Sequence, residues 1–157
     1  MIDLSDFNVI LSTIPHKEPF RFIDSIEELD ENYCTGTYHF KKNEYFYSGH
    51  FPGLPITPSV ILIECMAQIG LIPLGMVNLA KVDPKVDFES IKPIFTNSEI
   101  KVGAPVYPET TVTVEAKNIY FRLNRLKTKV KMRNERGDVC CSGTLSGIFL
   151  PNESIKI

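Results

Sequence analysis

Residues 59 to 80 restrict the fold more than any other part of this sequence, because the stretch is apolar on every side of a helix. Its length is about that of a membrane-spanning segment. Glu64, Gln68 and Asn78 lie inside it, however, and neither flank has the cluster of basic residues that orients a helix in a bilayer. We therefore expect a helix that is buried in the core of a folded domain.

The two ends of this helix are marked by prolines. Pro55 and Pro58 disfavour helix before them, and Ser59 is a good N-cap or first-turn residue. Pro73 lacks the amide hydrogen that a helix interior requires. The helix is thus expected to begin near residue 59 and to kink or end early near residue 73.

Most of the other segments have the composition or the alternation of β-strands. The segments 33–40 and 110–116 are rich in β-favouring residues, and "NERGD" at 134–138 predicts a turn into a last strand at 139–150. The clearest alternation runs from 126 to 133. Its alternate residues are expected on opposite faces of a strand. One face has Leu126, Thr128, Val130 and Met132, and the other has Lys127, Lys129, Lys131 and Arg133.

A sheet with one polar face must cover something apolar, and a helix that is apolar all round must be wrapped. The pattern therefore predicts an α+β fold in which an antiparallel β-sheet wraps around a long central helix. The sequence has no internal repeat, low-complexity tract or linker, so we expect a single domain over residues 1–157.

Composition and charge exclude some classes of protein. The net charge of −2 gives no overall attraction to nucleic acid or to an anionic membrane. The four cysteines have no metal-type spacing and are typical of reduced thiols, and the N-terminus lacks the pattern of a secretory signal. We expect a cytoplasmic protein without a metal site.

Two titratable side chains stand out around the start of the helix. His50 lies in the Gly/Pro-rich stretch "SGHFPGLP", and Glu64 follows on the helix among apolar neighbours. Burial disfavours the ionised form of a carboxyl group, so Glu64 is expected to be a neutral acid. Histidine titrates near neutral pH and can act as a base. Such a pair can remove a proton from one carbon and a hydroxyl from the next.

The helix N-terminus adds a third element to this candidate site. The first-turn amides at Ser59 and Val60 have no partner within the helix, and they can hold and polarise a thioester carbonyl that Gly53 lets approach closely. Gln68 lies one turn after Glu64 and is placed to orient it or to hold a water. Each of these residues alone is more often structural, but their combination indicates a site.

The motif "GHFPGLPITPSVILIECMAQ" resembles the signature of the bacterial 3-hydroxyacyl-acyl-carrier-protein dehydratases of fatty-acid biosynthesis, which have the hot-dog fold. "IPHKEPFRFID" is similar to the P-H-x-x-P-F opening of that family, and "APVYPETTVTVEA" is similar to its P-V-x-P-G-D strand entry. The resemblance covers most of residues 11 to 150.

This resemblance implies a lyase that needs no cofactor, with His50 as the base and Glu64 as the acid. It also implies a homodimer, or a trimer of such dimers, in which His50 of one protomer meets Glu64 of the other. The carbonyl near Ile56 would orient His50, and the amide of Ser59 would bind the thioester carbonyl. Glutamate at position 64 is similar to the general elongation dehydratases rather than to the branch that also isomerises the double bond.

The sequence departs from the family pattern at several positions. Thr57-Pro58-Ser59 replaces the usual M-P-G, and Glu109-Thr110 replaces the G-D of P-G-D. The segment 88–100 is longer than is usual. These changes leave His50 and Glu64 in place. We expect them to affect the substrate range and the rate of the reaction.

A basic segment suggests a partner. Residues 117–136 contain eight lysines and arginines and one acid, Glu135. A surface of this kind would attract an acidic acyl carrier protein, although lysines on a strand also serve to prevent edge pairing. The segment has no recognisable nucleic-acid-binding motif.

The remaining histidines and aromatic residues have simpler interpretations. His16 belongs to the family opening and is interpreted as structural, and His39 has no evident partner. The aromatic side chains are expected in the core or at an interface, with some lining an acyl tunnel: Phe20, Phe22, Phe46 and Phe51.

Two other functions remain open beside the dehydratase. A hot-dog acyl thioesterase would use a carboxylate to help water attack the thioester and would not require His50. A non-catalytic subunit that binds acyl carrier protein would be consistent with the altered Thr57 and Ser59.

Overall fold

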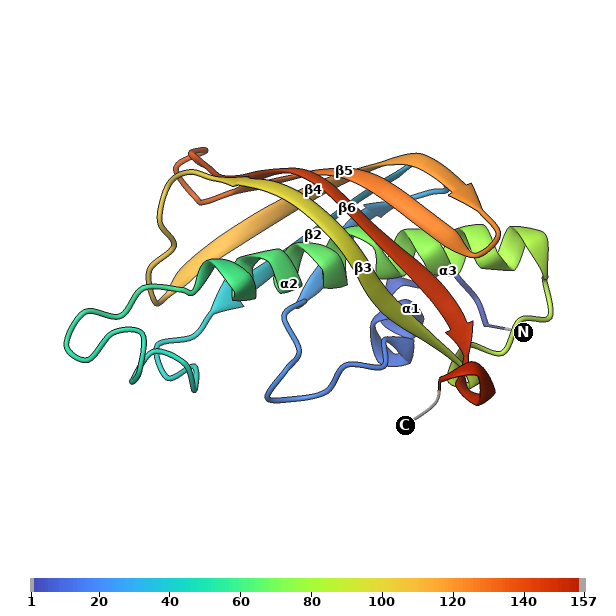
Figure 1. Ribbon diagram of the computed structural model, residues 1–157, viewed down its shortest axis with the longest axis horizontal. Helices are drawn as coiled ribbons and strands as arrows, with labels where there is room; N and C mark the ends of the chain where they lie inside the picture. Colours follow the sequence, from blue (N-terminus) through green and yellow to red (C-terminus); the bar gives the residue numbers. More distant parts are fainter. Residues whose placement is uncertain (1, 156–157) are drawn as a thin grey trace.

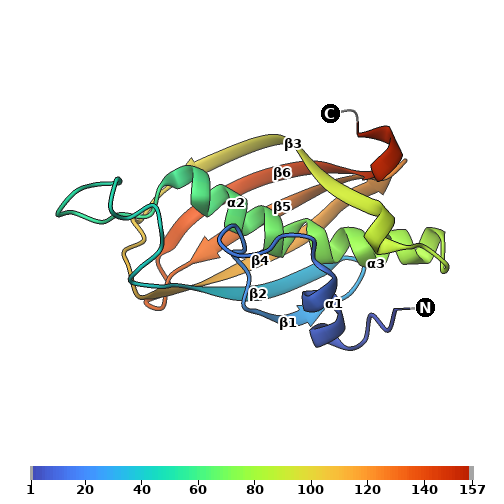
Figure 2. The same cartoon turned by 90° about the horizontal axis from the view of Figure 1, so that it is seen from below.

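The structure is a computed structural model, and it describes residues 2–155. Six strands form one antiparallel sheet in the order β1-β2-β4-β5-β6-β3, as Figures 1 and 2 show. The strands are β1 (Ser25–Leu29), β2 (Tyr33–Phe40), β3 (Ile91–Val102), β4 (Thr110–Arg122), β5 (Arg125–Arg133) and β6 (Val139–Pro151). The helices are α1 (Phe7–Thr13), α2 (Ser59–Gly70) and α3 (Ile72–Val82), with short 3₁₀ turns η1 (Phe88–Ser90) and η2 (Asn152–Ser154).

The sheet curls over α2 and α3, which run one after the other along its inner face (Figures 1 and 2). The segment Ser59–Val82 is long and apolar enough to cross a membrane, but 78% of its most apolar window is buried inside the fold. At Gly70, a β-carbon would lie 3.0 Å from Val130 and 3.1 Å from Ala116, so the helix backbone packs directly on β4 and β5. The expected α+β fold, with a sheet wrapped around a central helix, is confirmed.

Prolines set the limits of the central helix as the sequence predicted. Pro58 is the N-cap of α2 and Ser59 its first residue. Leu71 separates α2 from α3, and Pro73 lies in the first turn of α3, where its missing amide hydrogen costs nothing. The prediction of a kink or early end near residue 73 is confirmed.

Strand alternation in β5 is also confirmed. Leu126, Thr128, Val130 and Met132 are buried under the helix, whereas the intervening basic side chains face outward. Strands β2, β4 and β6 contain the other three predicted segments.

Three elements were not predicted, namely α1, β1 and β3. Strand β3 lies at the edge of the sheet, and its residues 94–97 are all exposed, so no face of it alternates between apolar and polar. It is a strand because its backbone pairs with β6, and the local sequence does not reveal such a long-range pairing.

Candidate active site

An apolar cavity of about 250 Å³ opens between α2, the start of α3, the N-terminal segment and the β3–β6 edge of the sheet. Glu64, Gln68 and His16 supply its polar side chains. The other lining residues are Phe20, Ala67, Leu71, Ile72, Pro93, Ile94, Phe95, Gly147, Ile148 and Phe149. A cavity with an apolar wall and a few convergent polar groups is the usual form of a small-molecule site.

Glu64 points from the middle of α2 into this cavity, and its side chain keeps 21% of its surface exposed. Glu64 is therefore partly rather than fully buried in a single chain, because it lines a cavity instead of packing in the core. Glu64 thus lies where a ligand in the cavity could reach it.

Gln68 fixes the orientation of Glu64, as its position one turn later predicted. Its carbonyl oxygen accepts a hydrogen bond from the backbone N–H of Phe22 (2.6 Å), and its amide nitrogen donates to the carbonyl of Phe20 (3.1 Å). The same nitrogen donates to Oε1 of Glu64 at 2.9 Å. Because the backbone N–H of Phe22 requires an acceptor, the amide cannot be flipped. Oε1 of Glu64 is therefore the acceptor of this hydrogen bond.

His16 lies beside Glu64 as well, which the sequence analysis missed when it interpreted this residue as structural. Its Nε2 is 3.5 Å from Oε1 of Glu64, and its side chain is 24% exposed. Burial lowers the pKa of His16, the carboxylate of Glu64 opposes that change, and Arg21 adds to it. The one available signal was its place in the "PHKEPF" motif.

His50 lies in the loop 41–58, which extends away from the body of the molecule (Figure 1). Its Nδ1 is 2.8 Å from the carbonyl oxygen of Ile56, and its ring stacks on Phe51 at 4.1 Å between centroids. A carbonyl oxygen only accepts, so Nδ1 carries a hydrogen and Nε2 of the neutral ring has a free lone pair. The carbonyl that holds the ring is the one that the family resemblance implied.

Within one chain the base and the acid are not brought together. His50 does not line the cavity, and no hydrogen bond or ion pair joins it to Glu64 in the described residues. Around His50, apolar side chains face solvent: Phe51 is 50% exposed, Leu54 59% and Val60 72%. Gly53, in the same loop, has a φ of 75°, which glycine adopts readily.

The first turn of α2 has free amides, as expected for a helix N-terminus. The N–H groups of Ile61 and Leu62 both donate to the carbonyl of Pro58. Among the described residues, those of Ser59 and Val60 have no acceptor. Both residues are exposed, so a carbonyl could approach their amides.

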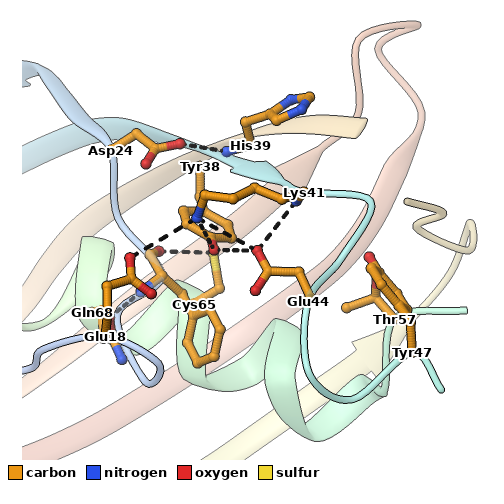
Figure 3. A network of polar contacts seen from close by, with 11 residues as sticks. Glu18, Asp24, Tyr38, His39, Lys41, Glu44, Tyr47, Thr57, Cys65 and Gln68 are labelled. Atoms are coloured by element: carbon orange, nitrogen blue, oxygen red, sulfur yellow. Dashed lines mark hydrogen bonds and ion pairs between the residues drawn. The ribbon is translucent and has the colours of Figure 1, made fainter. Parts of the chain in front are cut away.

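A polar network holds the loop of His50 to β2 and to the N-terminal segment (Figure 3). The hydroxyl of Tyr38 donates to Glu44 at 2.5 Å, and the ammonium of Lys41 lies 3.8 Å from Glu44 and 3.9 Å from Glu18. Burial, together with these carboxylates, raises the pKa of Tyr38. Lys41 thus links the segment of His16 to the loop of His50.

Thr57, one of the departures from the family pattern, closes the same loop. Its hydroxyl lies 2.7 Å from that of Tyr47, and both residues are buried (Figure 3). Burial raises the pKa of Tyr47 to about 12. Residues 47 and 57 flank His50, so this hydrogen bond joins the two ends of the loop that carries the base.

Breaking the Tyr47–Thr57 hydrogen bond should destabilise the protein. Thr57→Val or Tyr47→Phe alone leaves one buried hydroxyl without its partner, at a cost of about 1–3 kcal/mol in the free energy of unfolding. The double variant removes both hydroxyls and should cost less than the sum of the two. Urea unfolding of the four proteins measures the coupling, and additive effects would show that the contact contributes nothing.

Another departure from the family pattern has a backbone explanation. Glu109 has a φ of 63°, in the left-handed region that glycine occupies most easily. The glycine of the P-G-D pattern fits this conformation without steric cost, whereas glutamate adopts it here with its N–H bonded to the carbonyl of Phe40. The backbone path is kept despite the change of residue.

The remaining histidine and aromatic predictions have mixed outcomes. His39 does have a partner, because its Nδ1 lies 2.9 Å from the hydroxyl of Thr111 on the neighbouring strand. Phe22 is fully buried and Phe46 packs against the core. Phe20 lines the cavity, and Phe51 is half exposed.

The basic segment forms part of the outer face of the sheet and the turn between β4 and β5. In the described structure none of its eight basic side chains forms an ion pair. Arg125 pairs with Ile148 of β6, and the N–H of Phe149 donates to the carbonyl of Asn124. Since Ile148 and Phe149 line the cavity, the basic turn lies next to its wall.

Comparisons with known proteins show what the chain is similar to. A model of the FabA-like domain family matches residues 14–142. The curated 3-hydroxyacyl-acyl-carrier-protein dehydratase FabZ of Caldicellulosiruptor saccharolyticus is 31% identical over 142 residues, which are 89% of this chain and 95% of that protein.

Two solved structures share the fold. A chain of the dehydratase heterocomplex ApeI:P from Xenorhabdus doucetiae superposes with a TM-score of 0.72 at 13% identity, over 92% of both chains. A thioesterase from Haemophilus influenzae superposes with a TM-score of 0.56 at 15% identity, over 81% of this chain and 78% of that one. At these identities the likeness establishes the hot-dog fold alone.

Proposed function

Because the chain belongs to the FabA-like family, as its motifs predicted, we propose that it removes water from a (3R)-3-hydroxyacyl thioester carried on an acyl carrier protein, to give the trans-2-enoyl product. The observation that carries this proposal is the oriented acid, Glu64, in an apolar cavity that could hold an acyl chain. Such a lyase reaction belongs in the biosynthesis of fatty acids or related acyl chains, in the cytoplasm.

In the proposed mechanism, Nε2 of His50 takes the proton from C2 of the substrate. The electron pair of that C–H bond forms the C2–C3 double bond, and the C3–O bond breaks. Glu64 gives the proton on Oε2 to the departing hydroxyl, directly or through a water, so that water leaves. Nothing changes oxidation state overall, and no cofactor is required.

The negative charge that develops on the thioester oxygen needs hydrogen-bond donors. The free amides of Ser59 and Val60 at the positive end of α2 meet this need. Gly53 allows the thioester to come close, and Gln68 keeps Oε1 of Glu64 as an acceptor. The side chain of Ser59 narrows the approach, which limits the bulk of the acyl group near C1.

We propose further that the working site forms between two copies of the chain. A homodimer, or a trimer of such dimers, would bring His50 of one protomer to Glu64 of the other. Two features support this: the separation of the two residues in one chain, and the exposed apolar side chains around His50. Burying Phe51, Leu54 and Val60 against a second copy would provide a driving force for association.

The basic segment 117–136 is the proposed contact for the carrier protein. Its cations have no carboxylate partners in the described structure, and the turn at Arg125 adjoins the cavity wall. An acidic carrier protein bound there could pass its acyl group into the cavity.

The proposal is tested by mass spectrometry of purified protein with 3-hydroxyacyl-carrier-protein substrates of several chain lengths. The expected result is the loss of one water from the acyl group, for at least one chain length. Release of the free acid would replace the proposal with a thioesterase. Binding of the carrier protein without any change in its acyl group would indicate a non-catalytic subunit.

A further inference from the structure

His16 has two features that the proposed mechanism does not yet use. Its Nε2 lies 3.5 Å from Oε1 of Glu64, the oxygen that already accepts from Gln68. Its Nδ1 is buried and has no hydrogen-bond partner in the described structure. A buried N–H without an acceptor costs more than a lone pair without a donor, so the hydrogen of the neutral ring belongs on Nε2. The ring therefore presents an N–H to Glu64.

We propose that His16 is a positioning residue for Glu64, and that its Nε2–H and the Gln68 amide together hold Oε1 of Glu64 as an acceptor and leave the acid's proton on Oε2. This inference rests on the proposed function and adds a residue to the same site. The hydrogen bond from Gln68 at 2.9 Å, with Nε2 of His16 at 3.5 Å from the same oxygen, favours one rotation of the carboxyl group. The two N–H groups also withdraw electron density from it, which makes the Oε2 proton easier to transfer to the leaving hydroxyl.

Burial, rather than the neighbouring charges, favours the neutral form of His16 that this role needs. Burial lowers the pKa of His16 from the ordinary histidine value of 6.5, and Arg21 lowers it further. Arg21 is held next to it by hydrogen bonds from its guanidinium to the carbonyls of His16 and Leu11. On α2 the charged neighbour is Glu64, and β3 and β6 face the cavity with uncharged residues only.

The test compares His16→Gln, which keeps an N–H donor near the position of Nε2, with His16→Leu, which removes it. His39→Leu is the matched control, because His39 bonds to Thr111 outside the cavity. For His16→Leu we expect kcat to fall about tenfold or more at nearly unchanged KM, whereas His16→Gln should stay within about threefold of wild type. His39→Leu should match wild type.

A second readout does not depend on activity. ¹⁵N NMR of the histidine rings should show the hydrogen of neutral His16 on Nε2. A hydrogen on Nδ1 would overturn the inference.

The kinetic outcomes separate this inference from the proposed function. If wild type shows no dehydration, the proposed function fails, and the ¹⁵N spectrum still decides whether His16 directs an N–H toward Glu64. If wild type is active and His16→Leu equals it, only the role of His16 fails. Equal losses in His16→Leu and His16→Gln, with a lowered melting temperature in both, would show that His16 is merely structural.

Discussion

Replacing His50 with alanine should lower kcat for dehydration by about 1,000-fold, with little change in KM. The variant loses the side chain proposed as the base, whose ring is held by the contact of its Nδ1 with the carbonyl oxygen of Ile56. Glu64→Gln should cause a loss of similar size, because the amide keeps the shape and the bond to Gln68 but has no proton to transfer. Steady-state kinetics on the carrier-protein substrate measures both.

The controls for this prediction separate chemistry from folding. His50 lies in an exposed part of its loop, so His50→Ala should unfold at nearly the same urea concentration as wild type. His39→Ala removes a histidine that lies outside the cavity and should retain full activity. Dehydration by His50→Ala at the wild-type rate would rule out this residue as the base. Hydrolysis that persists without His50 would instead fit a thioesterase.

The fold could be predicted from the sequence where a local pattern reflects burial. Leu126, Thr128, Val130 and Met132 alternate with basic residues because β5 has one face on the helix and one in solvent. Pro73 breaks the central helix by its own chemistry, wherever the segment lies. Edge strand β3 has no such pattern, since its middle residues are all exposed and do not alternate between a buried face and a solvent face.

The candidate site was only partly predictable, for a related reason. Gln68 and Glu64 are one helical turn apart, so their contact follows from helix geometry. His16 comes from a segment far away in sequence and reaches Glu64 because the backbone of Phe20 and Phe22 is anchored on Gln68. No local pattern in "PHKEPF" predicts the contact of His16 with Glu64. The hydroxyl pair of Tyr47 and Thr57 is hidden in the same way, since neither residue by itself suggests a partner.

The same reasoning explains why the burial of Glu64 was overestimated. Its neighbours on α2 are apolar because most of the helix packs against the sheet and the core. One stripe of α2, at Glu64, Ala67 and Gln68, lines the cavity instead. The sequence of an apolar helix does not show which of its residues pack in the core and which line a cavity. Apolar side chains suit both places, because an acyl chain and a protein core are both apolar.

Two inactive variants should restore activity to each other if the site is shared between protomers. In a heterodimer of one His50→Ala chain and one Glu64→Gln chain, one site receives both substitutions and the other receives neither. Because the two sites of a symmetric dimer are equivalent, about half of the wild-type activity per dimer should return. Chains carrying two different affinity tags, co-expressed and purified on both tags, provide this heterodimer.

The reciprocal heterodimer makes the test decisive. A wild-type chain paired with a His50→Ala, Glu64→Gln double variant has one substitution in each shared site, so this heterodimer should be inactive. If His50 and Glu64 instead acted within one chain, the results would exchange: the first heterodimer would be inactive and the second would keep about half of the activity. The separation of His50 from the Glu64 cavity in the single chain, and the solvent-facing Phe51, Leu54 and Val60, favour the shared arrangement.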